Sequence, residues 1–293
     1  MRDVDARSVT TPSPLMGEGW GEGEGEGVSP NLPLSPTPLP RGERGSFGSI
    51  LKIATYNIHK GRSQFNRRAV LPELRERLQG LDADIVFLQE VQGAGARRTM
   101  LRRRATLPQP QHEFLAGENW PHRVYGKNAI YEAGHHGNAI LSRYPILRWD
   151  NQDISAHGLE QRGVLHSEME LPNGLTLHCL CVHLGLLKQW RGRQFSVLLD
   201  RIRDQVPEDA PLIVAGDFND WNDHASYLLA RELHLREVFD AHHGRLARSY
   251  PAGLPLLRMD RIYVRGLDVR HSEIHAWRKI SDHAALSTTL VLP

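Results

Sequence analysis

Polar side chains that can bind a metal ion or transfer a proton lie next to one apolar, strand-like segment after another. Asn57 follows residues 53–56, Glu90 follows residues 85–89, and His183 follows residues 180–182. The other members of this strand-end set adjoin residues 212–216, 261–264 and 285–292, and they are Asp217, Asn219, Asp260, Ser281, Asp282 and His283. Each alone is more often a loop residue or a helix cap. Because strand ends of an α/β sheet converge on one crevice, we expect the set to form one site.

The oxygen-bearing members of the set predict a site for a divalent cation. Asn57, Glu90 and Asp217, with Asp282 as a further candidate, offer the hard oxygen ligands that hold Mg²⁺ with waters still bound. Mn²⁺ is a plausible substitute because it accepts the same ligands. The sequence contains no P-loop, no G-x-S-x-G motif and no H-E-x-x-H motif. It therefore does not support the interpretation of the chain as a P-loop nucleotide-binding protein, a serine hydrolase or a zincin metalloprotease.

The histidines of the set add the means to move protons. His183 and His283 can donate protons or neutralise charge on a phosphoryl group. Asp260 can accept from a ring N–H of His283 and fix its tautomer. The combination predicts metal-dependent hydrolysis of a phosphate ester.

These residues need a scaffold of strands, and residues 49–293 supply one. Apolar segments predict strands at 51–57, 84–89, 139–142, 164–170, 175–184, 212–215, 261–264 and 285–292. Helices are predicted at 189–206 and around the apolar stripe of residues 70–81. Irregular alternation of helices and strands predicts one α/β domain. Residues 1–48 hold nine glycines and seven prolines and predict disorder, either as a flexible tail or as a translated inverted repeat that is not native.

Bulk composition is that of a globular protein. Hydrophobic residues make up 40%, charged residues 24%, and the formal net charge is +2, so no global basic field marks a nucleic-acid binder. Cys179 and Cys181 would share a strand face about 6–7 Å apart, too far for a disulfide. We interpret them as core residues rather than zinc ligands. With no apolar run of ~20 residues and no signal-peptide core, the expected location is the cytoplasm.

Several segments together resemble the endonuclease/exonuclease/phosphatase superfamily. They are "IATYNIHKG", "DIVFLQEVQ", "GNAILSRYPI", "CVHLG", "AGDFNDW", "MDRIYV" and "SDHAAL", and they span residues 51–293 in the family's order. The chain is most similar to small bacterial members with "TYNIHKG". The resemblance implies a four-layered α/β sandwich, in which two central mixed β-sheets are flanked by helices.

The resemblance also implies a role for each matching residue. Asn57 and Glu90 match the metal-binding pair, Asp217 the residue that orients or deprotonates water, and Asn219 the contact to phosphoryl oxygens. Ser281, Asp282 and His283 match the terminal S-D-H motif, with Asp260 as the carboxylate partner of that histidine. His183 resembles the general acid of deoxyribonuclease I and sphingomyelinases.

The leading interpretation is a phosphodiesterase that acts on nucleic acid or on a lipid or small-molecule diester. Alternatives are a phosphomonoesterase of the inositol-phosphate type and a non-catalytic nucleic-acid-binding module of the same fold. Asn138, Arg143 and Arg162 either contact substrate or make strand-end hydrogen bonds. The arginines of residues 97–104 either steer a polyanion or form a solvated surface. The sequence identifies no protein partner.

Overall fold

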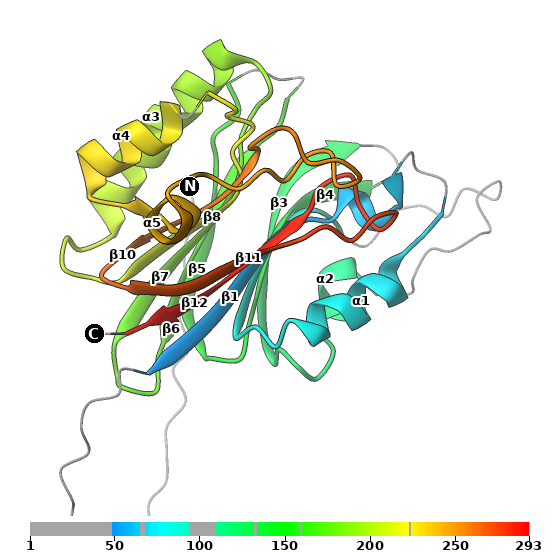
Figure 1. The fold of residues 1–293 in the computed structure, drawn as a ribbon, viewed down its shortest axis with the longest axis horizontal. Coiled ribbons are helices and arrows are strands. Elements are labelled where there is room, and N and C mark those ends of the chain that lie inside the picture. The colour runs from blue at the N-terminus through cyan, green and yellow to red at the C-terminus, as the bar shows by residue number, and fades with distance from the viewer. Residues whose placement is uncertain are drawn as a thin grey trace, which may run out of the picture. The chain divides into compact units, whose positions relative to one another are not determined.

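Two six-stranded mixed sheets form the centre of the computed structural model, which describes residues 49–64, 68–93, 109–131, 134–156, 158, 160–222 and 224–292. The predicted disorder of residues 1–48 and the arginines of residues 97–104 lie outside the described residues. The first sheet has the order β11-β12-β1-β2-β4-β3, and the second has the order β5-β6-β7-β8-β10-β9 (Figure 1). In each sheet one pair is parallel, β1 with β2 and β7 with β8, and the described neighbours otherwise pair antiparallel.

The strands of the first sheet are β1 (Ile50–Asn57), β2 (Ile85–Gln92), β3 (His122–Tyr131), β4 (Gly134–Ser142), β11 (Asp268–His275) and β12 (Ala285–Val291). Those of the second are β5 (Ile146–Asp153), β6 (Gly163–Glu170), β7 (Thr176–His183), β8 (Leu212–Asp217), β9 (Arg236–Glu237) and β10 (Asp260–Arg265). The helices are α1 (Leu71–Gly80), α2 (Gln111–Ala116), α3 (Lys188–Gln205), α4 (His224–Leu233) and α5 (Val238–His243), with a 3₁₀ turn at His59–Gly61.

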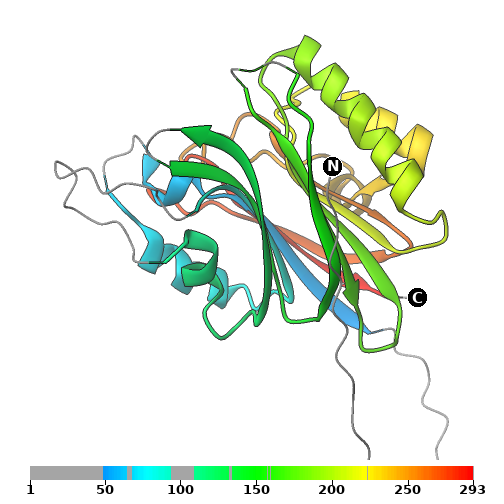
Figure 2. The same cartoon turned by 180° about the vertical axis from the view of Figure 1, so that it is seen from behind.

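Three apolar layers hold the elements together. Inward-facing residues of both sheets, such as Ile53, Cys181 and Ile213, form the layer between the sheets. Residues on the opposite face of the first sheet, such as Tyr56, pack under α1 and α2 and form the second layer. The third layer lies between the second sheet and helices α3 and α4 (Figure 2). Because central strands are buried on both faces, they read in the sequence as continuous apolar runs. The predicted four-layered sandwich is confirmed, and both cysteines are free and buried.

The strands that sequence patterning missed are the edge strands. β3, β5, β9 and β11 occupy the four sheet edges. β5 is largely exposed, and its sequence ILRWDNQD has no buried apolar face. Charged and polar residues on an edge strand prevent it from pairing with the edge strands of other molecules. Such strands therefore lack the apolar pattern by which a strand is predicted from sequence.

The strand that carries Glu90 is longer than predicted. β2 continues to Gln92, and Glu90 lies inside it with φ 56°, at a shift of register between Leu88 and Val91. A left-handed residue in a strand interrupts the alternation of side chains. The bulge therefore gives Glu90 an orientation that a regular strand would not.

A buried histidine pair links the outer surface of the second sheet to α3. His166 Nε2 lies 3.0 Å from His178 Nδ1, and Arg201 of α3 approaches His166 Nδ1 at 3.4 Å while also pairing with Asp150. Burial lowers the pKa of His166 to about 4, and the charge of Arg201 adds to the effect. The pair is therefore neutral when the protein is folded at neutral pH.

This pair makes the folded state sensitive to acid. Below pH 6.5 the unfolded chain takes up a proton that folded His166 refuses until about pH 4, so stability falls as the pH drops through that window. Between pH 7.5 and 5.0 we expect a loss of about 2 kcal/mol from this residue, at ~1.36 kcal/mol per pH unit. Urea denaturation of His166→Gln should show a shallower pH dependence of the free energy of unfolding than that of the wild-type protein. Equal pH slopes for His166→Gln and wild type would contradict this account.

Candidate active site

The carboxylate of Asp217 is the centre of the strand-end set. Asp217 ends β8, where it is paired with His183 at the end of β7 and with Asp260 at the start of β10. Its side chain is buried. From the other sheet, Asn57 Nδ2 donates to Asp217 Oδ2 at 3.1 Å. The two sheets therefore meet at this carboxylate, as the strand-end pattern predicts.

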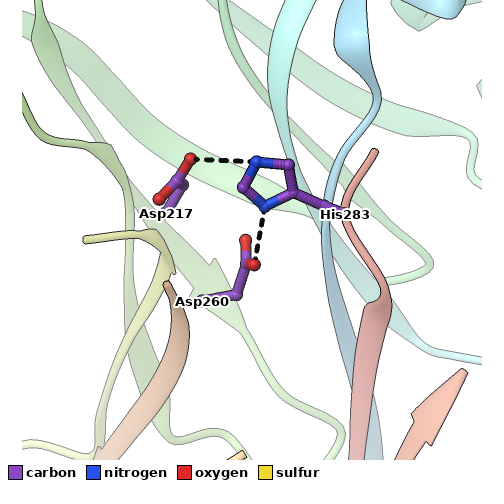
Figure 3. Close-up of side chains that lie close together, drawn as sticks. All are labelled: Asp217, Asp260 and His283. Carbon is purple, nitrogen blue, oxygen red and sulfur yellow. Dashed lines mark hydrogen bonds and ion pairs between the residues drawn. The ribbon is translucent and has the colours of Figure 1, made fainter. Parts of the chain in front are cut away.

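His283 stands between two carboxylates (Figure 3). Its Nδ1 lies 2.8 Å from Asp260 Oδ2, and its Nε2 lies 3.7 Å from Asp217 Oδ2. The ring of Tyr250 covers it, with centroids 5.0 Å apart. The backbone N–H of Asp260 donates to Ser249 Oγ at 3.1 Å, which holds the main chain at the start of β10. The predicted partnership of Asp260 with His283 is present in this geometry.

Burial and mutual charge set the protonation of this group. Burial opposes a charged imidazole, but the two carboxylates outweigh it and raise the pKa of His283 above its usual range. Burial also raises the pKa of Asp217, the neighbouring imidazolium counteracts this, and Asp260 reinforces it. We therefore place one proton on His283 and a carboxylate of increased basicity at Asp217.

The second histidine has the opposite electrostatic character. His183 Nε2 lies 3.5 Å from Asp217 Oδ2. Burial lowers the pKa of His183 well below its usual range, and the charges of Arg162 and His283 act in the same direction. His183 is therefore neutral in the free protein and has no extra proton to give. A general-acid role would require the negative charge of a substrate to raise its pKa.

Asn219 forms hydrogen bonds to the carboxylate of Asp217 and to the backbone of Leu184. It has φ 50°, and its backbone N–H donates to Asp217 Oδ1 at 3.0 Å. Its side-chain Nδ2 donates to the carbonyl of Leu184 at 2.9 Å, which ties the loop after β8 to the loop after β7. The expected contact of Asn219 with phosphoryl oxygens stays a prediction.

The candidate metal ligands lie on three neighbouring strands of the first sheet. Asn57 ends β1, Glu90 lies in the bulge of β2, and Asp282 precedes β12. Asn57 Oδ1 accepts from the His59 N–H at 3.1 Å, and Lys60 Nζ is 3.9 Å from Glu90 Oε2. The side-chain oxygens of Asn57 and Glu90 fit a hard cation, because each has a lone pair that can bind the metal.

Asp282 is engaged differently from its neighbours. His59 Nδ1 lies 3.2 Å from Asp282 Oδ1, and this hydrogen bond lowers the pKa of Asp282 although burial opposes the shift. The same contact raises the pKa of His59. Asp282 is thus already bonded to His59, so it fits a supporting role better than a direct ligand role.

Asp217, Asp260 and His283 form another group whose ligand atoms lie within 4.8 Å of one another. Both ring nitrogens of His283 face carboxylates, and the bond to Asp260 is of normal hydrogen-bond length. A cation here would have to replace the imidazole proton. Mg²⁺ prefers oxygen ligands and keeps several waters, which this buried group does not suit. We therefore assign proton handling to this group.

A cavity of about 430 Å³ opens beside Glu90. Its lining residues come from the first sheet, the turn after β1, the connection from β5 to β6, and α3; they are Lys60, Glu90, Tyr131, His136, Glu160, Gln161, Arg162 and Trp190. Arg162 contacts Glu160 Oε1 at 3.2 Å and the carbonyl of Leu184 at 3.3 Å. The expectation that Arg162 contacts substrate agrees with this location. Lys60 and Glu160 were not anticipated.

Arg143 is not part of the site. It follows β4 at the end where Ser142 pairs with Ile85, which is the start of β2, whereas Glu90 lies toward the other end. Its guanidinium binds Asp82 at 2.7 Å and Asp84 at 3.1 Å. Of the two alternatives given for Arg143, these contacts agree with the strand-end interaction.

Asn138 has mainly a structural contact. It is buried, and its Nδ2 donates to the carbonyls of Gly163 at 3.0 Å and Cys181 at 3.2 Å, which join β4 to the second sheet. The amide nitrogen is therefore engaged in strand-end hydrogen bonds, one of the two alternatives given for Asn138. Only Oδ1 is buried without a hydrogen-bond partner.

The signal for the missed residues His59 and Lys60 was present in the sequence. Both follow Asn57 directly, and both adopt positive φ, 46° and 57°. This turn brings His59 to Asp282 and Lys60 to Glu90. The periodicity of a helix or strand does not indicate such a turn. Two basic residues between Asn57 and Gly61 could still have suggested contacts with the carboxylates of the site.

The two histidines should titrate in opposite ways. We expect NMR of the imidazole nitrogens to show His283 protonated at pH 7, because Asp260 and Asp217 stabilise its charge, and His183 neutral. In Asp260→Asn the pKa of His283 should fall by more than one unit, while His183 should remain neutral. A neutral His283 in the wild-type protein at pH 7 would contradict this assignment.

Comparison with known proteins adds to this geometry. The model of the endonuclease/exonuclease/phosphatase family matches residues 54–283. The protein YbhP of Escherichia coli strain K12 is 45% identical over 246 residues, which cover 82% of this chain and 96% of YbhP. No described helix is both long enough and apolar enough to cross a membrane.

Solved structures share the fold at low identity. TDP2 of D. rerio complexed with a single-strand DNA product has a TM-score of 0.62 at 19% identity, covering 83% of this chain and 99% of that one. The mannosyl-6-phosphatase Bt3783 of Bacteroides thetaiotaomicron has a TM-score of 0.63 at 17% identity, covering 83% and 100%. With the family match over most of its length, the chain belongs to the endonuclease/exonuclease/phosphatase family.

Proposed function

We propose that the protein is a Mg²⁺-dependent phosphodiesterase. The observation that carries this proposal is the buried carboxylate of Asp217, which accepts hydrogen bonds from Asn57 and Asn219 and lies within 3.7 Å of an imidazole. Family membership supports hydrolysis of a phosphate ester. A non-catalytic nucleic-acid-binding module is disfavoured because such a precise arrangement of titratable groups has no role in simple binding.

Each residue has a separate task in this proposal. Asn57 and Glu90 would hold the cation, which when bound would lower the pKa of water and neutralise charge on phosphoryl oxygens. Asp217 accepts the proton of the attacking water, a task favoured by its raised pKa. His283, protonated and oriented by Asp260, stabilises negative charge on the phosphoryl group.

His183 completes the set on the side of the second sheet. As a neutral imidazole it donates a hydrogen bond to a phosphoryl or leaving-group oxygen. The approach of an anionic substrate raises its pKa, and the residue then becomes able to supply a proton to the leaving group. Asn219 keeps Asp217 oriented throughout through its backbone N–H.

The charges around the cavity favour a diester. Among its described lining residues, Lys60 is paired loosely with Glu90, and Arg162 is already bonded to Glu160. Burial lowers the pKa of His136 to about 4, so it brings no charge at neutral pH. A diester carries one negative charge on its phosphate, whereas a monoester carries up to two. The limited positive charge therefore suits a diester of a nucleic acid, a lipid or a small molecule.

Loss of the general base should remove most of the activity. With bis-p-nitrophenyl phosphate and Mg²⁺, we expect Asp217→Asn to lower kcat by about 10²–10⁴-fold. Arg143→Gln is the matched control, because Arg143 binds only Asp82 and Asp84 among the charged groups described, and kcat should stay near the wild-type value. Wild-type turnover by Asp217→Asn would remove the proposed mechanism.

Glu90→Gln separates metal binding from proton transfer. Replacing the carboxylate by an amide weakens a hard oxygen ligand, so half-maximal activity should need on the order of tenfold more Mg²⁺. Saturating Mg²⁺ should restore much of kcat, in contrast to Asp217→Asn. An unchanged Mg²⁺ requirement would exclude Glu90 as a ligand.

Comparison of two substrates distinguishes the diesterase from the monoesterase alternative, which the fold of Bt3783 supports. We expect kcat/KM for bis-p-nitrophenyl phosphate to exceed that for p-nitrophenyl phosphate by about tenfold or more, since the cavity offers little charge for a dianion. The measurement is initial rates at matched Mg²⁺. A preference of the same size for the monoester would establish the alternative.

A further inference from the structure

More than half of the exposed large apolar side chains that the structure describes lie at the end of β3 and in three connections, those from β7 to α3, from β8 to α4 and from α5 to β10. They are Ile130, Tyr131, Leu186, Leu187, Trp221, Leu254, Leu256 and Leu257. We call this set the loop rim. Leu254 is 66% exposed and Leu186 is 54% exposed, values far above those of core leucines. Apolar side chains so displayed mark an interaction surface when they gather in one region.

The loop rim lies close to the candidate site along the chain. Leu186 and Leu187 follow His183, and Trp221 follows Asn219. The connection from α5 to β10, which carries Leu254, Leu256 and Leu257, leads into Asp260 (Figure 1). Tyr131 lines the same cavity as Glu90. Each part of the rim is thus joined to a site residue by a few positions of chain.

The exposed charges that the structure describes in or beside these segments are cationic. Arg245 and Arg248 are exposed in the connection from α5 to β10, and Lys188, the first residue of α3, is exposed beside Leu186 and Leu187. Asp220 lies in the connection from β8 to α4 and is buried, and the sequence also has Glu132 directly after Tyr131 and Asp223 two residues after Trp221. Apolar side chains interspersed with lysine suit the surface of an anionic bilayer, where the side chains enter the headgroup region and the ammonium groups meet lipid phosphates.

The composition of the rim favours a bilayer over single-stranded nucleic acid. Proteins hold single strands with aromatic rings on which bases stack. The rim is mostly aliphatic, with Tyr131 and Trp221 as its aromatic members. Leucine and isoleucine side chains provide burial in a lipid interface but no stacking surface.

We propose that the loop rim docks on an anionic phospholipid bilayer and presents the site to the phosphodiester of a lipid headgroup. The substrate half of this proposal rests on the proposed function; the docking half does not. Docking by the rim would place the cavity beside Glu90 and the carboxylate of Asp217 next to the phosphate layer, because rim and site share the same connections. Hydrolysis would then occur at the membrane surface, where lipid diesters are concentrated.

The test is vesicle flotation of the full chain. Vesicles of phosphatidylcholine with phosphatidylglycerol, about 7:3, should bind the protein, and phosphatidylcholine alone should bind it several-fold more weakly. The double variant Leu254→Ser/Leu256→Ser should lower the bound-to-free ratio about tenfold or more. Lys188→Gln should lower it about fivefold, the equivalent of ~1 kcal/mol per cation. Leu147→Ser/Trp149→Ser, in an edge strand of the second sheet, is the matched control and should bind like wild type.

Docking and catalysis are separated by Asp217→Asn, which should bind vesicles like wild type but not hydrolyse their lipids. If it bound and also hydrolysed, the proposed function would fail and docking would stand. Absence of vesicle binding by the wild type would overturn the docking proposal. An equal loss of vesicle binding in the rim variants and in the control variant would also overturn it. Binding of single-stranded DNA in place of vesicles by the loop rim would overturn it as well. Unchanged thermal melting of the variants excludes unfolding as the cause of any loss.

Discussion

The site depends on keeping a buried carboxylate supplied with hydrogen bonds from both sheets. Asp217 belongs to the second sheet, yet one of its oxygens accepts from Asn57 of the first. Ser281, which precedes β12, donates to the carbonyl of Asn57 at 2.8 Å and so connects the S-D-H segment to the same point. A buried charge without such partners would be costly or would become protonated. The position of one sheet on the other is therefore fixed by polar contacts as well as by the apolar layer between them.

The groups around this carboxylate are held by buried polar contacts. The side chain of Arg261 is fully buried, and its guanidinium donates to the carbonyls of Asp260 and Asp220 at 3.1 and 2.9 Å. These bonds join the start of β10 to the loop that contains Asn219. Asp260 Oδ1, by contrast, is buried without a hydrogen-bond partner. An unsatisfied acceptor costs free energy, and its presence beside His283 is typical of a functional rather than a structural cluster. Preorganisation of this kind removes the need to reorient dipoles as charge develops.

Sequence reasoning succeeded where the physical signal is local. Central strands such as β1 and β8 are apolar on both faces, and the polar residues that end them were correctly expected to meet. It failed at the edge strands, because their polar residues lack the apolar pattern of a strand. It left the role of Arg143 open, because Asp82 and Asp84 become its partners only through folding. The roles of His59 and Lys60 depend on a turn with positive φ, and the spacing of apolar residues in the sequence does not indicate that turn. Asn138 shows the same limit, because a strand-end amide can face a backbone carbonyl as readily as a ligand.

The central claim is that the cation and the transferred proton occupy different groups of side chains. Anomalous diffraction from crystals soaked in Mn²⁺ tests this claim most directly. We predict a peak in contact with Asn57 Oδ1 and the Glu90 carboxylate, at about 2.0–2.2 Å as expected for a small hard cation. A peak enclosed by Asp217, Asp260 and His283 would contradict the account, because the proton on His283 and the base at Asp217 would then both be metal ligands.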